Sequence, residues 1–261
     1  MRKSFFVGLS IYLFIGLSAC SPEKSQQQTK KIELTISAAA SLNEALVEIK
    51  NQFEEKNPQI KLLYNIGGSG ALKQQILQGA PVDIFLSASH DQFNELIQEA
   101  IIDREKQIDL LGNQLVLITN KENQFSLNGF SDLGLSQVNK IAIGIPESVP
   151  AGKYAKQTLE NAGIWKQLEP NLIQTKDVRQ VLTYVETGNV DAGIVYATDI
   201  NSSNKVKVVA TADEETHDPI VYPAGIIKST SHKNEAELFL TYLQSTSAKT
   251  IFKKYGFKVL D

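Results

Sequence analysis

Strand and helix patterns alternate along this chain of 261 residues, and the alternation begins twice. Short apolar stretches predict strands, and stripes of apolar residues at helical spacing predict helices between them. The predicted strands are 32–38, 60–66, 82–87, 115–118, 140–145, 192–196, 206–210 and 220–227, and the predicted helices are 42–53, 72–77, 150–159, 178–186, 236–243 and 248–255. Because a strand–helix–strand unit places its two strands in parallel, this order predicts an α/β fold with helices on the faces of parallel sheets.

The break between the two runs falls near residue 112, which indicates two lobes. The order of the elements fits best if the second unit is inserted in the first, so we expect lobe I at 32–112 plus 218–261 and lobe II at 113–217. Ligands of open α/β sheets lie outside the carboxyl ends of the strands. A cleft between two facing lobes is therefore the expected site.

The N-terminus has the pattern of an export signal, with two basic residues before an apolar run over 5–17 that is short for a membrane span. Leu-Ser-Ala-Cys at 17–20 resembles the lipobox of bacterial lipoproteins, and Cys20 is the only cysteine. We expect a lipoprotein signal peptide at 1–19, a lipid on Cys20, and a flexible tether over 20–31, because that polar stretch has almost nothing to bury. An ordinary signal peptide that happens to contain a cysteine is the alternative.

Charge excludes one class of partner. Without residues 1–19 the chain has 24 basic and 29 acidic residues, a net charge of −5, and its basic residues form no cluster. Such a surface does not attract nucleic acid. If the ligand is an anion, local dipoles must attract it.

Four short stretches open predicted helices with no catalytic set nearby. They are Ala-Ala-Ala-Ser-Leu at 38–42, Gly-Gly-Ser-Gly-Ala-Leu at 67–72, Val-Pro-Ala-Gly-Lys-Tyr at 149–154 and Lys-Asp-Val-Arg-Gln at 176–180. A helix N-terminus presents unpaired N–H groups and a partial positive charge. Since each lobe has two such starts, all four could converge in the cleft and bind a small oxyanion without Lys or Arg.

Two of these starts carry a serine. Ser41 can offer both its N–H and its hydroxyl, and a plain N-cap serine is the alternative. Ser69 is flanked by glycines that allow a ligand to approach the backbone, and a flexible turn is the alternative. In the second lobe Pro150 places Ala151 in a first helical turn, and an N-cap at Asp177 would leave the N–H of Val178 at the helix end, so these two positions could contribute only backbone donors.

Several of these motifs, in this order, resemble the bacterial periplasmic molybdate-binding proteins of ABC import systems. The resemblance covers residues 32–258. It rests on Ala-Ala-Ala-Ser-Leu, Gly-Ala-Pro-Val-Asp-Ile-Phe-Leu-Ser-Ala, Leu-Leu-Gly-Asn-Gln-Leu-Val, Val-Pro-Ala-Gly-Lys-Tyr-Ala-Lys, Asp-Val-Arg-Gln-Val-Leu, Gly-Ile-Val-Tyr and Ile-Phe-Lys-Lys-Tyr-Gly-Phe. It implies the two-lobe type II binding-protein fold, in which each lobe is a mixed, mostly parallel sheet flanked by helices and the ligand lies in the cleft.

The resemblance also implies the ligand and the residues that hold it. In that family two serines, two backbone N–H groups and a tyrosine hydroxyl bind the oxyanion; the matching positions here are Ser41, Ser69, Ala151, Val178 and Tyr196. From its residue type alone, Tyr196 could equally be a buried aromatic whose hydroxyl is satisfied nearby. Gly67-Gly68-Ser69-Gly70 departs from the more Ser-rich stretch of other members, which puts a second hydroxyl contact there in doubt.

The implied role is capture of molybdate, and of tungstate, by a monomer that carries no cofactor. A membrane permease of an ABC transporter would receive the anion, and the lipid anchor would hold the protein on a membrane facing the periplasm or the cell exterior. A site made only of donors disfavours hydrogen phosphate, whose P–O–H group would lack an acceptor.

Sulfate or another small oxyanion, or a small organic acid, stays an alternative ligand, because the sequence does not give the size of the cavity. A hydrolase is the remote alternative, since no Gly-x-Ser-x-Gly elbow is present and the three histidines lie in polar stretches outside the candidate site.

Overall fold

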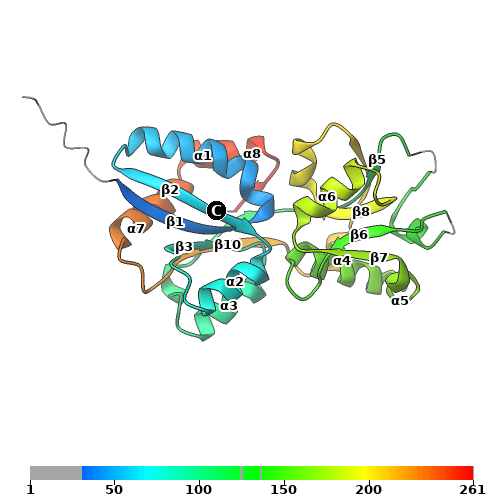
Figure 1. Cartoon of the computed structure of the whole chain (residues 1–261), viewed down its shortest axis with the longest axis horizontal. Coiled ribbons are helices and arrows are strands. Elements are labelled where there is room, and N and C mark those ends of the chain that lie inside the picture. Colours follow the sequence, from blue (N-terminus) through cyan, green and yellow to red (C-terminus); the bar gives the residue numbers. More distant parts are fainter. Residues whose placement is uncertain (1–30, 124–125, 136, 261) are drawn as a thin grey trace, which may run out of the picture. The chain divides into compact units, whose positions relative to one another are not determined.

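Two β-sheets organise the structure, a computed structural model that describes residues 31–123, 126–135 and 137–260 (Figure 1). We call the six-stranded sheet with its helices lobe I and the five-stranded sheet with its helices lobe II. The expected signal peptide, Cys20 and the tether up to residue 30 lie outside the described residues. Among the described residues, no helix has the length and apolar character needed to span a bilayer.

The lobe I sheet has the strand order β11-β4-β10-β3-β1-β2. The strands are β1 (Ile32–Ala39), β2 (Ile60–Gly67), β3 (Ile84–Leu86), β4 (Ile108–Gly112), β10 (Val221–Ile226) and β11 (Lys258–Val259). Strand β1 pairs in parallel with β2 and with β3, whereas β10 is antiparallel to β3 and β4, and β11 is antiparallel to β4.

The lobe II sheet has the order β7-β6-β8-β5-β9. Its strands are β5 (Leu115–Asn120), β6 (Ile141–Gly144), β7 (Leu172–Thr175), β8 (Ala192–Tyr196) and β9 (Val206–Thr211). Strand β6 is parallel to β7 and β8, and β5 is antiparallel to β8 and β9. The expectation of mixed sheets is confirmed, but antiparallel pairs are as frequent as parallel ones in lobe II and more frequent in lobe I. The strands that connect one sheet to the other are β4, β5, β9 and β10, and these strands are antiparallel to their neighbours.

Helices flank both sheets. The α-helices are α1 (Asn43–Lys56), α2 (Ser69–Leu77), α3 (His90–Gln98), α4 (Pro150–Asn161), α5 (Trp165–Leu168), α6 (Val178–Glu186), α7 (Lys233–Leu243) and α8 (Thr246–Lys254). The 3-10 helices are η1 (Ala40–Leu42), η2 (Arg104–Lys106), η3 (Phe130–Gly134), η4 (Glu169–Asn171), η5 (Ala197–Ser202) and η6 (Glu214–Thr216). In Figure 1, α1 and α2 lie on opposite faces of the lobe I sheet, and α6 and α4 lie on opposite faces of the lobe II sheet.

The same local topology occurs in each lobe. A first strand lies between the two strands that follow it in sequence: β1 lies between β2 and β3, and β6 lies between β7 and β8. The chain moves to one side of the middle strand for its first neighbour and to the other side for its second. Since crossover connections between parallel strands are right-handed, the helices of these connections lie on opposite faces of the sheet. The chain therefore diverges at the carboxyl ends of β1 and β6, which is where ligands bind in open α/β sheets.

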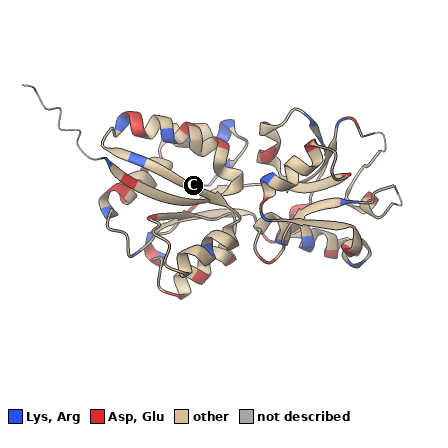
Figure 2. Cartoon of the chain, in the orientation of Figure 1, with Lys and Arg blue, Asp and Glu red and all other residues tan. Residues whose placement is uncertain are grey.

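The chain passes between the lobes twice, from β4 into β5 through Asn113 and Gln114, and from β9 back to β10 through η6. After the second passage, α7, α8 and β11 return to lobe I, where α7 packs on β10 and α8 on α1 and β11. In sequence, the strands of the five-stranded sheet therefore lie between β4 and β10 of the six-stranded sheet. Acidic and basic residues are interspersed along the helices and loops, and the strands carry few of either (Figure 2).

Candidate ligand-binding site

All five predicted ligand-binding residues line one small cavity. Each lies just after, or at, the carboxyl end of a different parallel strand: Ser41 after β1, Ser69 after β2, Ala151 after β6, Val178 after β7, and Tyr196 at the end of β8. The cavity is small, with a volume of about 10 Å³. It therefore has room for about one water-sized molecule in this structure.

The cavity is uncharged. Its lining comprises Ala39, Ala40, Ser41, Gly67, Gly68, Ser69, Ala88, Val149, Pro150, Ala151, Val178 and Tyr196. None of these side chains carries a charge, and several of the residues open helices. The polar side-chain groups of this lining are hydroxyls, which donate and accept hydrogen bonds, and the first turns of its helices add unpaired N–H donors.

Ser41 lies inside η1, and the N-cap of the following helix α1 is Leu42, which makes no side-chain capping bond. The alternative interpretation of Ser41 as a plain N-cap is therefore wrong. Its side-chain oxygen is instead 2.8 Å from the hydroxyl oxygen of Tyr222 on β10. Ser41 is 7% exposed, so its hydroxyl is oriented by protein partners rather than by solvent.

Ser69 is the first residue of α2 and is fully buried, so it does not belong to a flexible turn. Its hydroxyl oxygen accepts a hydrogen bond of 3.0 Å from the N–H of Ala88, which lies two residues after the end of β3. An oxygen that accepts from the protein in this way keeps its own proton for another partner.

The lobe II starts have the backbone geometry that the sequence predicts. Pro150 occupies the first position of α4, which places Ala151 in the first turn. Asp177 is the N-cap of α6, and its carboxylate accepts the N–H of Gln180 at 2.9 Å. The N–H groups of Ala151 and Val178 therefore belong to first turns, where a helix offers no acceptor of its own.

Tyr196 carries the clearest sign of a missing partner. The residue is 1% exposed, and its hydroxyl oxygen is buried without a hydrogen-bond partner among the described residues. The alternative of a buried aromatic with a satisfied hydroxyl is therefore wrong. Burial raises the pKa of Tyr196 well above its ordinary value, so the hydroxyl stays protonated and can donate.

Contacts between the lobes close around this cavity. The N–H of Gly70 on α2 donates to the carbonyl of Ser148, two residues before α4, at 2.9 Å. Arg179 on α6 forms an ion pair of 2.9 Å with Glu44 on α1. Lys153 on α4 pairs with Asp91 on α3 and, at 2.7 Å, with Asp218. These contacts bring helix starts from both lobes to the same small volume.

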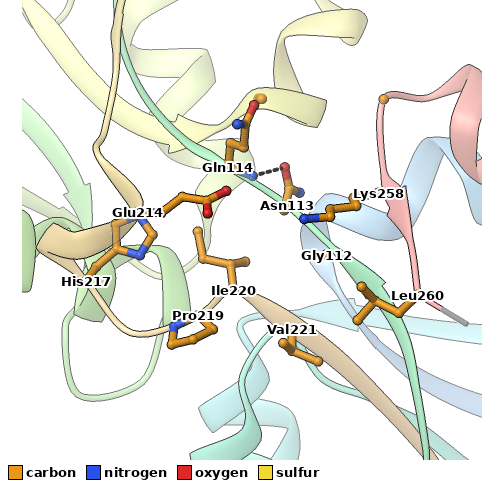
Figure 3. A pocket seen from close by; sticks show the side chains of 12 residues that line it. Gly112, Asn113, Gln114, Glu214, His217, Pro219, Ile220, Val221, Lys258 and Leu260 are labelled. Carbon is orange, nitrogen blue, oxygen red and sulfur yellow. Dashed lines mark hydrogen bonds between the residues drawn. The ribbon is translucent and has the colours of Figure 1, made fainter.

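A larger cavity of about 540 Å³ lies where the chain crosses between the lobes (Figure 3). Its lining includes Glu214, His217 and Lys258, which come from different segments. None of the five predicted residues lines it. The other histidines lie near Asp109 and Asp83, at 3.2 Å and 3.3 Å, and the described residues contain no cluster of His, Cys, Asp and Glu that could hold a metal ion.

The fold and the site define a class of protein: a two-lobed solute-binding protein of type II topology with a buried, donor-lined pocket between its lobes. The family model described as bacterial extracellular solute-binding protein matches residues 34–258. The chain belongs to this family of exported proteins, which bind a solute and are not enzymes.

Three known proteins show how near the similarity is. The chain is 46% identical to YvgL of Bacillus subtilis, a candidate ABC transporter substrate-binding lipoprotein, over 98% of both chains. It is 36% identical to the molybdate-binding protein ModA of Escherichia coli, over 95% of this chain and 97% of ModA. The structure of the periplasmic molybdate-binding protein of Azotobacter vinelandii matches with a TM-score of 0.79 at 23% identity, covering 87% of this chain and all of that one.

Sequence reasoning missed three residues that the structure brings to the site. Ala88 supplies the N–H that binds Ser69, while Tyr222 and Asn113 form a hydrogen-bonded chain behind Ser41. The Ser41–Tyr222 pair is separated by 181 positions, and such a contact leaves no signal in local periodicity.

Proposed function

We propose that this protein captures molybdate, and its larger analogue tungstate, in the cavity lined by Ser41, Ser69, Ala151, Val178 and Tyr196. Hydrogen bonds hold the oxyanion: three from hydroxyls and two from first-turn N–H groups. The lobes part to admit the anion and close to bury it. A membrane permease of an ABC transporter then receives it.

The observation that carries this proposal is the buried hydroxyl of Tyr196. A buried polar group without a partner costs about 1–3 kcal/mol, so such groups in native proteins are rare. Tyr196 lines the same small cavity as Ser41, Ser69, Ala151 and Val178, which can offer hydroxyl and first-turn N–H donors. A ligand that offers only acceptors satisfies all of them together. The similarity to a molybdate-binding relative supports molybdate among the small oxyanions.

The absence of a charged lining supports an anion that is fully ionised. Helix N-termini stabilise negative charge through their dipoles, and hydroxyls that direct their protons into the cavity offer few acceptors to a protonated oxyanion. Molybdate, tungstate and sulfate carry no proton near neutral pH, whereas phosphate does. Hydrogen phosphate would leave one O–H group facing donors, at a cost of about 1–3 kcal/mol.

Isothermal calorimetry of the protein purified without signal or lipid tests the proposal against molybdate, tungstate, sulfate and phosphate. We expect tight binding of the first two, weaker binding of sulfate because it is smaller, and the weakest binding of phosphate. Strong binding of an amino acid or a sugar, with no heat from either metal oxyanion, would contradict the proposal.

A lipid on Cys20 would anchor the protein, and the similarity to a lipoprotein of Bacillus subtilis supports this part of the proposal. Cys20→Ala removes the thiol that takes the lipid. The variant should accumulate unprocessed and leave the detergent phase in a partition assay. Equal partitioning of the variant and the wild type would remove the anchor from the account.

The proposed working unit is a monomer with lobe I at 32–112 plus 218–261 and lobe II at 113–217. The crossings of the chain from β4 to β5 and from η6 to β10 support these boundaries. Light scattering with and without molybdate measures the molar mass in solution. The mass of one chain is expected, and the mass of a dimer would contradict the proposed monomer.

A further inference from the structure

A hydrogen-bonded chain runs from the first crossing between the lobes to Ser41. Asn113, in the β4–β5 connection, donates through its side-chain nitrogen to the hydroxyl of Tyr222 at 3.1 Å and to the hydroxyl of Thr198 at 2.8 Å. Tyr222 lies 2.8 Å from the side-chain oxygen of Ser41. The distance alone does not say which of these two hydroxyls donates.

The orientation of the Asn113 side chain is fixed by its own neighbour. Its side-chain oxygen accepts the N–H of Gln114 at 2.9 Å, the bond drawn in Figure 3. An amide whose oxygen is held this way must turn its nitrogen toward Tyr222 and Thr198. The hydroxyl oxygen of Tyr222 is therefore an acceptor toward Asn113.

This acceptor role decides the direction of the next bond. Tyr222 is 1% exposed, and Ser41 is the only other hydrogen-bond partner of its hydroxyl among the described residues. If Ser41 donated to it, the buried phenol proton would have no acceptor, an arrangement that folded proteins avoid. Burial also raises the pKa of Tyr222 well above its ordinary value, so this proton is present. Tyr222 thus donates, and Ser41 accepts.

Because its oxygen accepts from Tyr222, Ser41 keeps its own proton for a group inside the cavity that it lines. Ser69 has the matching arrangement, since its oxygen accepts the N–H of Ala88. Each serine is therefore committed to donating into the cavity by a protein donor behind it.

We propose that Asn113 and Tyr222 are positioning and specificity-determining residues: they hold the Ser41 hydroxyl in the donor direction and occupy one of its two acceptor positions, and so disfavour oxyanions that carry a proton. This inference rests on the proposed oxyanion function and deepens it. Tyr222 touches the ligand-binding serine and does not line the cavity. Asn113 bonds to Thr198, beyond β8 of lobe II, and to Tyr222 of lobe I, so the same amide spans the crossing.

Tyr222→Phe tests the proposal, because it keeps the ring and removes the proton that Ser41 accepts. Both acceptor positions of the Ser41 oxygen are then available to a P–O–H group. We expect molybdate affinity to fall about tenfold and phosphate affinity to rise, so that the molybdate-to-phosphate affinity ratio measured by calorimetry at pH 7 falls at least thirtyfold.

Tyr154→Phe is the matched control. It also removes a buried phenol hydroxyl near the site, one that interacts with Ser89 and, at 3.5 Å, with the carbonyl of Ala88, and for which no bond to Ser41 is seen among the described residues. Its affinity ratio should equal that of the wild type. Equal falls in both affinities for Tyr222→Phe would mean general damage and would overturn the proposal, as would no change in either.

A second variant tests the direction of the chain. Asn113→Ala removes one of the two bonds that hold the Tyr222 hydroxyl in place, so its donation to Ser41 is held less firmly and the ratio should fall by less than in Tyr222→Phe. The double variant should match Tyr222→Phe alone, because the two residues act through one proton. Additive losses would overturn the relay. A wild type that binds neither molybdate nor sulfate would instead overturn the proposed function itself.

Discussion

Gly70→Ala should weaken ligand binding without weakening the ligand-free fold. A Cβ on Gly70 would lie 2.7 Å from the carbonyl oxygen of Ser148 and 2.8 Å from its Cα, whereas ordinary van der Waals contact begins at 3.4 Å. Gly70 belongs to lobe I and Ser148 to lobe II. The clash therefore lies between the lobes, and the ligand-free protein relieves it by opening.

The expected loss of affinity can be worked from the distance by which the Gly70 Cβ would be too close to Ser148. The two segments must separate by about 0.7 Å, which stretches the 2.9 Å bond from the Gly70 N–H to Ser148 beyond hydrogen-bonding distance. That bond contributes about 0.5–1.5 kcal/mol, and a lengthened charge-assisted bond from Ala151 to the anion costs about 1.5–3 kcal/mol more. Affinity should fall by about 2–4 kcal/mol, which is roughly 30- to 700-fold. Alanine is the better helix former, by at most about 1 kcal/mol in a first turn.

Gly67→Ala is the matched control in the same glycine-rich stretch. Its Cβ would make ordinary contacts of 3.5 Å and 3.7 Å with Leu72 of its own lobe. Calorimetry with molybdate and thermal unfolding without it give the two readouts for each variant. If Gly70→Ala binds as tightly as Gly67→Ala, closure does not depend on this contact and the reasoning fails. An equal loss of stability and affinity would show that the strain lies within one lobe.

Three further predictions concern single side chains. Tyr196→Phe should lower molybdate affinity by about 1–2 kcal/mol in calorimetry, because it deletes one hydrogen bond to a charged ligand and keeps the ring; unchanged affinity would return Tyr196 to a packing role. Val178→Pro should lower affinity by about 1.5–3 kcal/mol with little effect on the melting temperature, because Asp177 already has the extended backbone that precedes proline; normal binding by the folded variant would refute the helix-terminus mechanism. Burial raises the pKa of Asp199 to about 7, so its neutral form favours folding at low pH and that contribution is lost as the pH rises through 7. Asp199→Asn keeps an acceptor for the Tyr196 N–H and should be more stable than the wild type above pH 7, by roughly 2–4 kcal/mol, but not at pH 4; a gain that is the same at both pH values would contradict this.

The elements with strong local signals could be predicted closely. Helix α6 and strand β8 have the predicted bounds, because Asp177 caps the helix, Gly188 ends it and the strand is apolar throughout. Helix α3 was not predicted, although Ser89 caps it and Phe93 and Leu96 are its buried face. Strands β7 and β11 were not predicted either. They have four and two residues, and such short strands depend for stability on the strands beside them more than on their own sequence pattern.

Helix α2 begins three residues before the predicted start. Ser69 and Gly70 are poor helix formers, so periodicity favours a start at Leu72. In the structure the Ser69 oxygen binds the Ala88 N–H, and Gly70 binds Ser148 across the lobes. These tertiary contacts override the local preference, and they occur at the proposed site.

The candidate site divides in the same way. Ser41 and Ser69 could be proposed from their residue types, but Ala151 and Val178 offer only backbone groups, and the resemblance to the molybdate-binding family was needed to select them. Tyr222 and Asn113 had no signal, since their contacts join segments 181 and 109 positions apart. Side-chain chemistry is visible in a sequence, whereas the direction of a hydroxyl proton requires the three-dimensional network.

Anomalous diffraction from crystals grown with molybdate, collected at the molybdenum edge, tests the central claim most directly. The account predicts one strong molybdenum peak in the cavity, with its oxygens within about 2.7–3.1 Å of the hydroxyls of Ser41, Ser69 and Tyr196 and of the N–H groups of Ala151 and Val178. A peak in the larger cavity beside His217 and Lys258, or at any site where lysine or arginine binds the anion, would contradict it.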